Sequence, residues 1–138
     1  NYLEIAKKVG TKVHVLKDND GNHQDNIQKY SQKYDDCDRI KFFATQDNYQ
    51  YSLEPVLISS NQSSKSELNR YAKIALSSRT YNKYLKEKSL DDRAKFLIAW
   101  YADEGGAGKK KVDSAMRIFE SEQKIQYPDF IKKVLSFE

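Results

Sequence analysis

The residues best suited to metal chemistry are Asp18 and Asp20, which stand one residue apart at the end of an apolar run. That run, Lys12–Leu16, has the composition of a β-strand, and Gly21 follows the acidic pair. Open α/β sheets bind ligands beyond the carboxyl ends of their strands, and carboxylates there suit hard cations such as Mg²⁺ or Mn²⁺. Asp, Asn and Gly also form ordinary turns, and the segment on its own favours a polar turn.

Two other phosphate- or metal-binding motifs are excluded by position. A calcium loop starting at Asp18 requires glycine at its sixth place and glutamate at its twelfth, where His23 and Lys29 stand. A phosphate-binding loop at Gly108–Lys110 requires an earlier glycine, which Asp103 replaces. The spacing of Ser, His, Asp and Cys predicts no nucleophilic triad or dyad either.

The elements around the acidic pair predict a parallel sheet. A helix over residues 2–9 precedes the strand at 12–16, helical spacing continues over 24–34, and a second strand covers 39–44. This order of strand, helix and strand is typical of parallel pairing. We expect the first strand to be buried on both faces, with His14 packed and hydrogen-bonded inside it. A short extended segment is expected over residues 49–52.

The rest of the chain predicts helices. The first expected helix begins near Leu53, and the second begins at a capping box formed by Ser64–Glu67. A short helix is expected over Thr80–Lys88, and Ser89 caps the next one. The last two follow a glycine loop over Asp103–Gly108 and begin at Pro128, respectively. Apolar stripes predict buried faces, and the helix after the glycine loop should turn Val112, Ala115, Met116 and Phe119 inward. The chain is thus expected to be one α/β domain, with a sheet-containing part over 1–61 and a helical part over 62–138.

Composition sets broad limits on the class of protein. The 138 residues suit one domain, and 24 Lys and Arg against 20 Asp and Glu give a net charge of +4, which permits contact with a polyanion. The single cysteine, Cys37, excludes an internal disulfide and favours a reducing compartment. Since no apolar run approaches the roughly 20 residues of a membrane span, we expect a soluble, cytoplasmic protein.

Three separated segments, taken together, resemble the Toprim domain of the OLD (overcoming lysogenization defect) family of ATP-dependent endonucleases, which includes the Gabija anti-phage nuclease. Val13–Gly21 is similar to that family's strand ending in Asp-x-Asp-Gly. Ser52–Ile58 resembles its Leu-Glu segment with an apolar tail, and Lys111–Met116 resembles its lysine four residues before an alanine. Their order and approximate spacing agree over nearly the whole chain, so the resemblance implies a partial Toprim-like parallel sheet flanked by helices.

The resemblance implies a metal-dependent DNA endonuclease acting in phage defence. It assigns Asp18, Asp20 and Glu54 to the metal site, with Mg²⁺ or Mn²⁺ as the ion. It makes Lys111 the catalytic lysine, with its neighbours Lys109 and Lys110 as alternatives. Electrostatic attraction for DNA would come from scattered lysines, which are Lys83, Lys86, Lys88 and Lys109–Lys111.

The sequence also departs from the family pattern. Toprim domains have an earlier strand with a functional glutamate, whereas here only one short helix is predicted before the Asp-x-Asp strand. The family's ATPase domain is not in this chain, so ATP binding and homo-oligomer formation would come only through that domain. We therefore expect an excised C-terminal part, with weak metal binding and little or no DNA cleavage by itself. The alternatives are a non-catalytic interaction or scaffold fragment, or another Toprim-type phosphotransfer activity such as nucleotidyl transfer.

Overall fold

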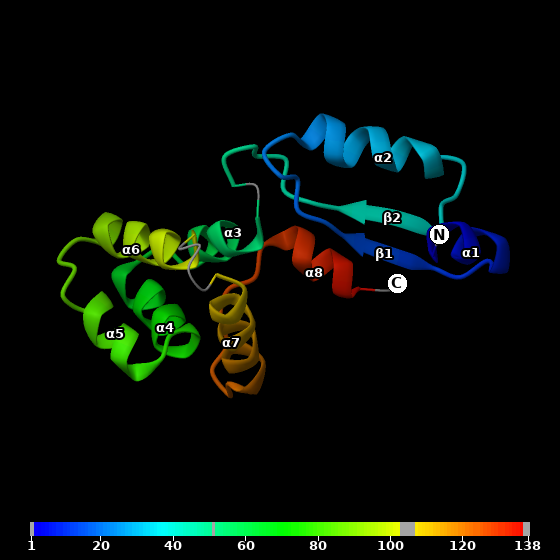
Figure 1. The fold of residues 1–138 in the computed structure, drawn as a ribbon. Coiled ribbons are helices and arrows are strands. Elements are labelled where there is room, and N and C mark those ends of the chain that lie inside the picture. The colour runs from blue at the N-terminus through cyan, green and yellow to red at the C-terminus, as the bar shows by residue number, and fades with distance from the viewer. Residues whose placement is uncertain (1, 51, 103–106, 137–138) are drawn as a thin grey trace. The chain divides into compact units, whose positions relative to one another are not determined.

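The computed structural model describes residues 2–50, 52–102 and 107–136, and it has a mixed α/β fold (Figure 1). The prediction of a small parallel sheet with flanking helices is confirmed. The chain divides into two compact units. The first comprises the residues up to Val56 together with those from Pro128 onward, and the second comprises Leu57–Tyr127. The first unit thus combines most of the predicted sheet-containing part with the last helix of the chain.

The sheet of the first unit consists of strands β1 (Val13–Leu16) and β2 (Ile40–Phe43). They pair in parallel, in a register that runs from Val13 opposite Ile40 to Leu16 opposite Phe43. The connection between them is the predicted helical segment, formed by η1 (Gln24–Gln28), α2 (Lys29–Ser31) and η2 (Gln32–Tyr34). The predicted strand, helix and strand are therefore confirmed.

Helices cover both faces of this sheet (Figure 1). On one face, the Phe42 ring contacts Tyr30 and Tyr34, at centroid distances of 5.6 and 5.9 Å. On the other face lies α8 (Asp129–Leu135), where the Val134 carbonyl oxygen is 2.8 Å from His14 Nδ1. His14 therefore has the hydrogen bond expected of it.

The prediction that β1 is buried on both faces is wrong in degree. Val13, His14 and Val15 are only half-buried, and Leu16 is 44% exposed. The strand is apolar, as its sequence shows. A sheet of two four-residue strands nevertheless offers too little surface for its covering helices to exclude water fully.

Helix α1 (Tyr2–Val9) has no buried residue and is tied to the unit by an ion pair. Lys7 Nζ lies 2.6 Å from Asp36 Oδ2, and this hydrogen bond holds the pKa of Asp36 below its usual value. Because the folded-state pKa is lowered, the pair stabilises the docked helix at neutral pH and is lost as the pH falls through that pKa.

The remaining helices are α3 (Leu53–Ser60), α4 (Lys65–Ala75), α5 (Ser78–Tyr84), α6 (Leu90–Ala102) and α7 (Ala107–Glu120). The predicted caps are present, since Ser64 Oγ accepts from Glu67 N at 3.2 Å and Ser89 Oγ accepts from Asp92 N at 3.0 Å. The predicted stripe of α4 is buried as expected, and it consists of Leu68, Tyr71, Ala75 and the following Leu76.

A buried arginine joins α5 to α6. The Arg93 guanidinium donates to the carbonyl oxygens of Glu87 and Leu85, at 2.8 and 3.4 Å, and lies over the ring of Tyr84. Burial raises the pKa of Tyr84 to about 12, so its hydroxyl stays protonated and donates to Asn69 Oδ1. No sequence pattern predicts that Arg93 is buried, because the two carbonyl oxygens that accept from its guanidinium belong to the backbone.

The prediction for α7 is wrong, because its apolar stripe faces outward. Val112 is 62% exposed, Met116 49% and Phe119 84%. Over the residues of α7 whose burial is described, 108–120, the buried one is Ser114, which hydrogen-bonds to the Tyr101 hydroxyl on the side where α7 packs against α4 and α6. Ala115 is exposed as well. The buried side of α7 thus carries a small polar residue instead of the apolar stripe.

Several elements differ from expectation in their bounds or their type. An extended segment is expected over residues 49–52, but residues 48–50 form a turn and a bend. Tyr51 of that expected segment lies outside the described residues. α5 ends at Tyr84 instead of Lys88. Residues 103–106 of the predicted glycine loop also lie outside the described residues, and α7 begins at Ala107. Among the helices that the structure describes, none combines the length and apolar character of a membrane span.

Asn61 fastens the two ends of the second unit to each other. Its side chain is fully buried and donates to the carbonyl oxygens of Leu57 and Gln126, at 2.8 and 2.9 Å. Its Oδ1 accepts from Gln126 N at 2.8 Å. The two bonds to Gln126 link Asn61, just after α3, to the chain segment that follows α7.

We predict that Asn61→Ala lowers the free energy of unfolding by roughly 2–3 kcal/mol, because it leaves buried backbone groups without their partner. Urea denaturation followed by circular dichroism measures this. The matched control is Asn82→Ala on the exposed side of α5, expected to change the free energy by less than about 0.5 kcal/mol. Equal effects of the two substitutions would contradict the assignment.

Candidate functional site

The turn after β1 is fixed by the buried side chain of Asn19. Its Nδ2 donates to the carbonyl oxygens of Thr45 and Asp47, at 2.9 and 3.0 Å, and its Oδ1 accepts from Gly21 N at 2.9 Å. The carbonyl oxygen of Asn19 accepts from Asn26 Nδ2 at 2.9 Å. The bonds to Thr45 and Asp47 join the turn after β1 to the segment after β2.

Sequence reasoning missed Asn19, although a signal for it exists. In an extended chain, neighbouring side chains point to opposite sides, so a residue between two exposed aspartates points inward. An amide suits that place because it both donates and accepts hydrogen bonds with backbone groups. Asn19 is in fact fully buried between Asp18 and Asp20.

Two of the predicted metal ligands, Asp18 and Glu54, line one cavity of about 280 Å³. Asp18 follows β1, and Glu54 lies in the first turn of α3. Lys17, Thr45 and Ser52 contribute further polar side chains to the cavity. Its apolar lining consists of Leu16, Leu53, Val56 and Phe130. The cavity therefore lies beyond the carboxyl end of the sheet, where the sequence predicted a site, and all of its residues belong to the first unit.

Asp20, the third predicted ligand, is not part of this cavity. Its backbone is left-handed, with φ of 51°, so the alternation that would aim it with Asp18 is broken. Its carboxylate lies 3.6 Å from Lys17 Nζ. Among the described residues, no group of three or more His, Cys, Asp or Glu side chains is close enough to hold a metal ion.

Lys17 is a second residue that sequence reasoning left out. It lines the cavity, and its Nζ also lies 3.5 Å from the Asp18 carbonyl oxygen. Its position, directly after the strand and before the acidic turn, was the available signal. A cation here can attract an anionic ligand such as a phosphate toward the two carboxylates.

The predicted catalytic lysine, Lys111, belongs to the second unit and does not line the cavity. It is half-buried on α7, while Lys109 is exposed. Lys110 Nζ lies 5.9 Å from the centre of the Trp100 ring, and the two side chains line a shallow cavity of about 480 Å³ together with Lys83. Two of the lysines predicted to attract DNA therefore come together beside an aromatic ring.

Comparison with protein-family models, with curated proteins and with solved structures gave no match. The resemblance to the OLD family accordingly rests on the three sequence segments, and the function derived from it is a proposal.

We predict that Asn19→Ala destabilises the first unit by roughly 2–3 kcal/mol, since the carbonyl oxygens of Thr45 and Asp47 lose their buried donor. Hydrogen exchange of the amides after β1 and β2 measures the effect locally. Gln24→Ala serves as the control, because Gln24 lies just after the same turn and is exposed. Unchanged exchange in the Asn19 variant would contradict its structural role.

Proposed function

We propose that this chain is the metal-dependent, phosphodiester-cleaving module of a DNA endonuclease similar to the OLD family. The observation that carries the proposal is the shared cavity of Asp18 and Glu54. These carboxylates come from distant parts of the sequence, and the resemblance had assigned both of them to one metal site.

The donor set of the cavity fits a hard divalent cation. Two carboxylates, with the Ser52 and Thr45 hydroxyls beside them, are oxygen ligands of the kind that Mg²⁺ and Mn²⁺ prefer. Asp18 and Glu54 would hold the ion. A bound divalent ion would polarise a phosphate oxygen and lower the pKa of a coordinated water.

The chain's own residues have separate roles in this proposal. Lys17 would hold a phosphate in the cavity by charge attraction. Asp20 would act indirectly, because its carboxylate pairs with Lys17 and so orients that ammonium group. Lys111 would keep the role that the resemblance implies, the offset of charge on the phosphate.

The second unit offers a surface suited to the DNA backbone. Lys83 and Lys110 line one shallow cavity with Trp100, Phe96 and Thr80. Lysines bind phosphates and release counterions, and an aromatic ring can stack with an unpaired base. This combination supports nucleic acid as the substrate class.

A second candidate function is a non-catalytic interaction module. The outward apolar stripe of α7, formed by Val112, Met116 and Phe119, favours it, since exposed apolar patches mark sites of association. Metal binding distinguishes the two functions, because a scaffold has no need of an ion between Asp18 and Glu54.

We predict that Mn²⁺ binds through Asp18 and Glu54. In calorimetric titration, Asp18→Asn with Glu54→Gln should abolish the binding, whereas Asp20→Asn should weaken it by roughly tenfold or less. The control pair is Asp91→Asn with Asp113→Asn on exposed helix surfaces of the second unit.

In the protein as its gene encodes it, nicking of supercoiled plasmid with Mn²⁺ should be lost in the Asp18→Asn, Glu54→Gln variant and kept in the control variant. Metal binding or nicking that survives in the first of these variants contradicts the proposal.

We further predict that Lys83→Ala with Lys110→Ala weakens DNA binding and lowers the slope of log K against log salt by up to about 2, one for each phosphate contact. Fluorescence anisotropy with a labelled duplex at several salt concentrations measures both quantities. Lys12→Ala with Lys33→Ala, at exposed positions of the first unit, is the matched control. An unchanged slope in the first variant would show that this surface does not contact DNA.

A further inference from the structure

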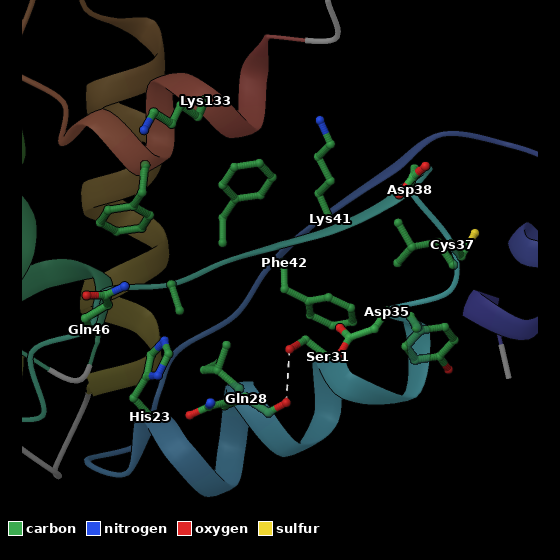
Figure 2. A pocket seen from close by; sticks show the side chains of 16 residues that line it. His23, Gln28, Ser31, Asp35, Cys37, Asp38, Lys41, Phe42, Gln46 and Lys133 are labelled. Carbon is green, nitrogen blue, oxygen red and sulfur yellow. Dashed lines mark hydrogen bonds between the residues drawn. The ribbon is translucent and has the colours of Figure 1, made fainter.

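A large groove runs along the outer edge of β2. Its volume is about 810 Å³, and Figure 2 shows side chains from three elements around it. Gln28 and Ser31 come from the helical connection between the strands, and Lys133 comes from α8. The strand itself forms the back of the groove.

The residues of β2 that line the groove show that it lies across the edge of the strand. Ile40, Lys41, Phe42 and Phe43 all contribute to it. Consecutive residues of a strand point to opposite faces of the sheet, so a cavity in contact with all four must wrap around the edge that β1 does not occupy. The groove is therefore the position in which a neighbouring strand would lie.

The backbone of β2 presents hydrogen-bonding groups to this position. The carbonyl oxygens of Arg39 and Phe43 accept from β1 and the residue after it, at 2.8 and 3.1 Å, so these residues face β1. By alternation, the N–H and C=O of Phe42 and the N–H of Ala44 face the groove. An unpaired strand edge is a template for the addition of another strand.

Charge differs along the groove. Asp35 and Asp38 lie near the start of β2, and Lys133 lies toward its other end (Figure 2). Lys41 is a further cation of the lining, and in Figure 2 it lies between Lys133 and Asp38. The apolar part of the lining includes Ile27, Phe42 and Phe130. An extended peptide with opposite charges at its two ends and apolar residues between them would complement this pattern.

We propose that the groove binds an extended peptide segment of a partner protein, which adds a strand to the edge of β2. A basic residue of the segment pairs with Asp35 and Asp38, and an acidic residue pairs with Lys133. Main-chain hydrogen bonds to Phe42 and Ala44 provide affinity, and the charges fix direction. A second copy of this chain at the same edge is distinguished from the peptide by the test below.

The test uses two capped hexapeptides of the same composition, Lys-Val-Thr-Val-Thr-Glu and its reverse, so that either strand direction is sampled. We expect one of them to bind the full chain with saturation near or below about 1 mM. Nuclear magnetic resonance should then show slowed hydrogen exchange at the amides of Phe42 and Ala44. Binding by neither peptide, or binding without that protection, overturns the proposal.

Charge variants give the control. Asp35→Lys with Asp38→Lys should weaken the preferred peptide about three- to tenfold, in line with exposed ion pairs that turn repulsive. Asp91→Lys with Asp113→Lys makes the same change of net charge away from the groove and should leave the affinity unchanged. If Phe42 and Ala44 are already protected without peptide, and more so at higher protein concentration, a second copy occupies the groove and the proposal is wrong.

Discussion

The buried amide of Asn19 is the constraint on which the candidate site depends. A buried amide must be hydrogen-bonded, and this one is bonded to Thr45, Asp47 and Gly21. It therefore fixes the turn after one strand against the segment after the other. Two residues of the cavity stand at this arrangement, since Asp18 precedes Asn19 and the Thr45 carbonyl oxygen accepts from it. A metal site needs rigid ligands, and the packed amide of Asn19 restrains the backbone beside one of them, Asp18.

Much of the fold could be predicted from the sequence because periodicity and caps are local signals. The parallel strands, their helical connection and the cap at Ser64 follow from such patterns and are confirmed. The inward face of α7 could not be predicted, because the buried side of a helix depends on the neighbouring helices against which it packs. Ser114 meets the Tyr101 hydroxyl there, and the apolar stripe with Phe119 is left outside. Tertiary contacts of small polar residues carry no periodic signal.

The sequence indicates where the candidate site lies in the fold, but not which side chains line it. The end of β1 and the first turn of α3 were indicated by Asp18 and Glu54, which indeed share a cavity. Asp20 was not predictable in the same way, because a single left-handed residue redirects its side chain toward Lys17. The proposed site thus has two carboxylates and a lysine of the first unit at its centre. The role of Lys111 rests on the resemblance to the OLD family alone.

The most direct test of this account is where a bound ion lies. Paramagnetic Mn²⁺ broadens nuclear magnetic resonance signals near it, so a titration of isotope-labelled protein locates the site residue by residue. The account predicts that the amide signals of Asp18, Thr45 and Glu54 disappear first and together, at the lowest ratio of metal to protein. Broadening that begins at other acidic residues, such as Asp91 or Asp113, or that spreads evenly over the surface, would contradict it.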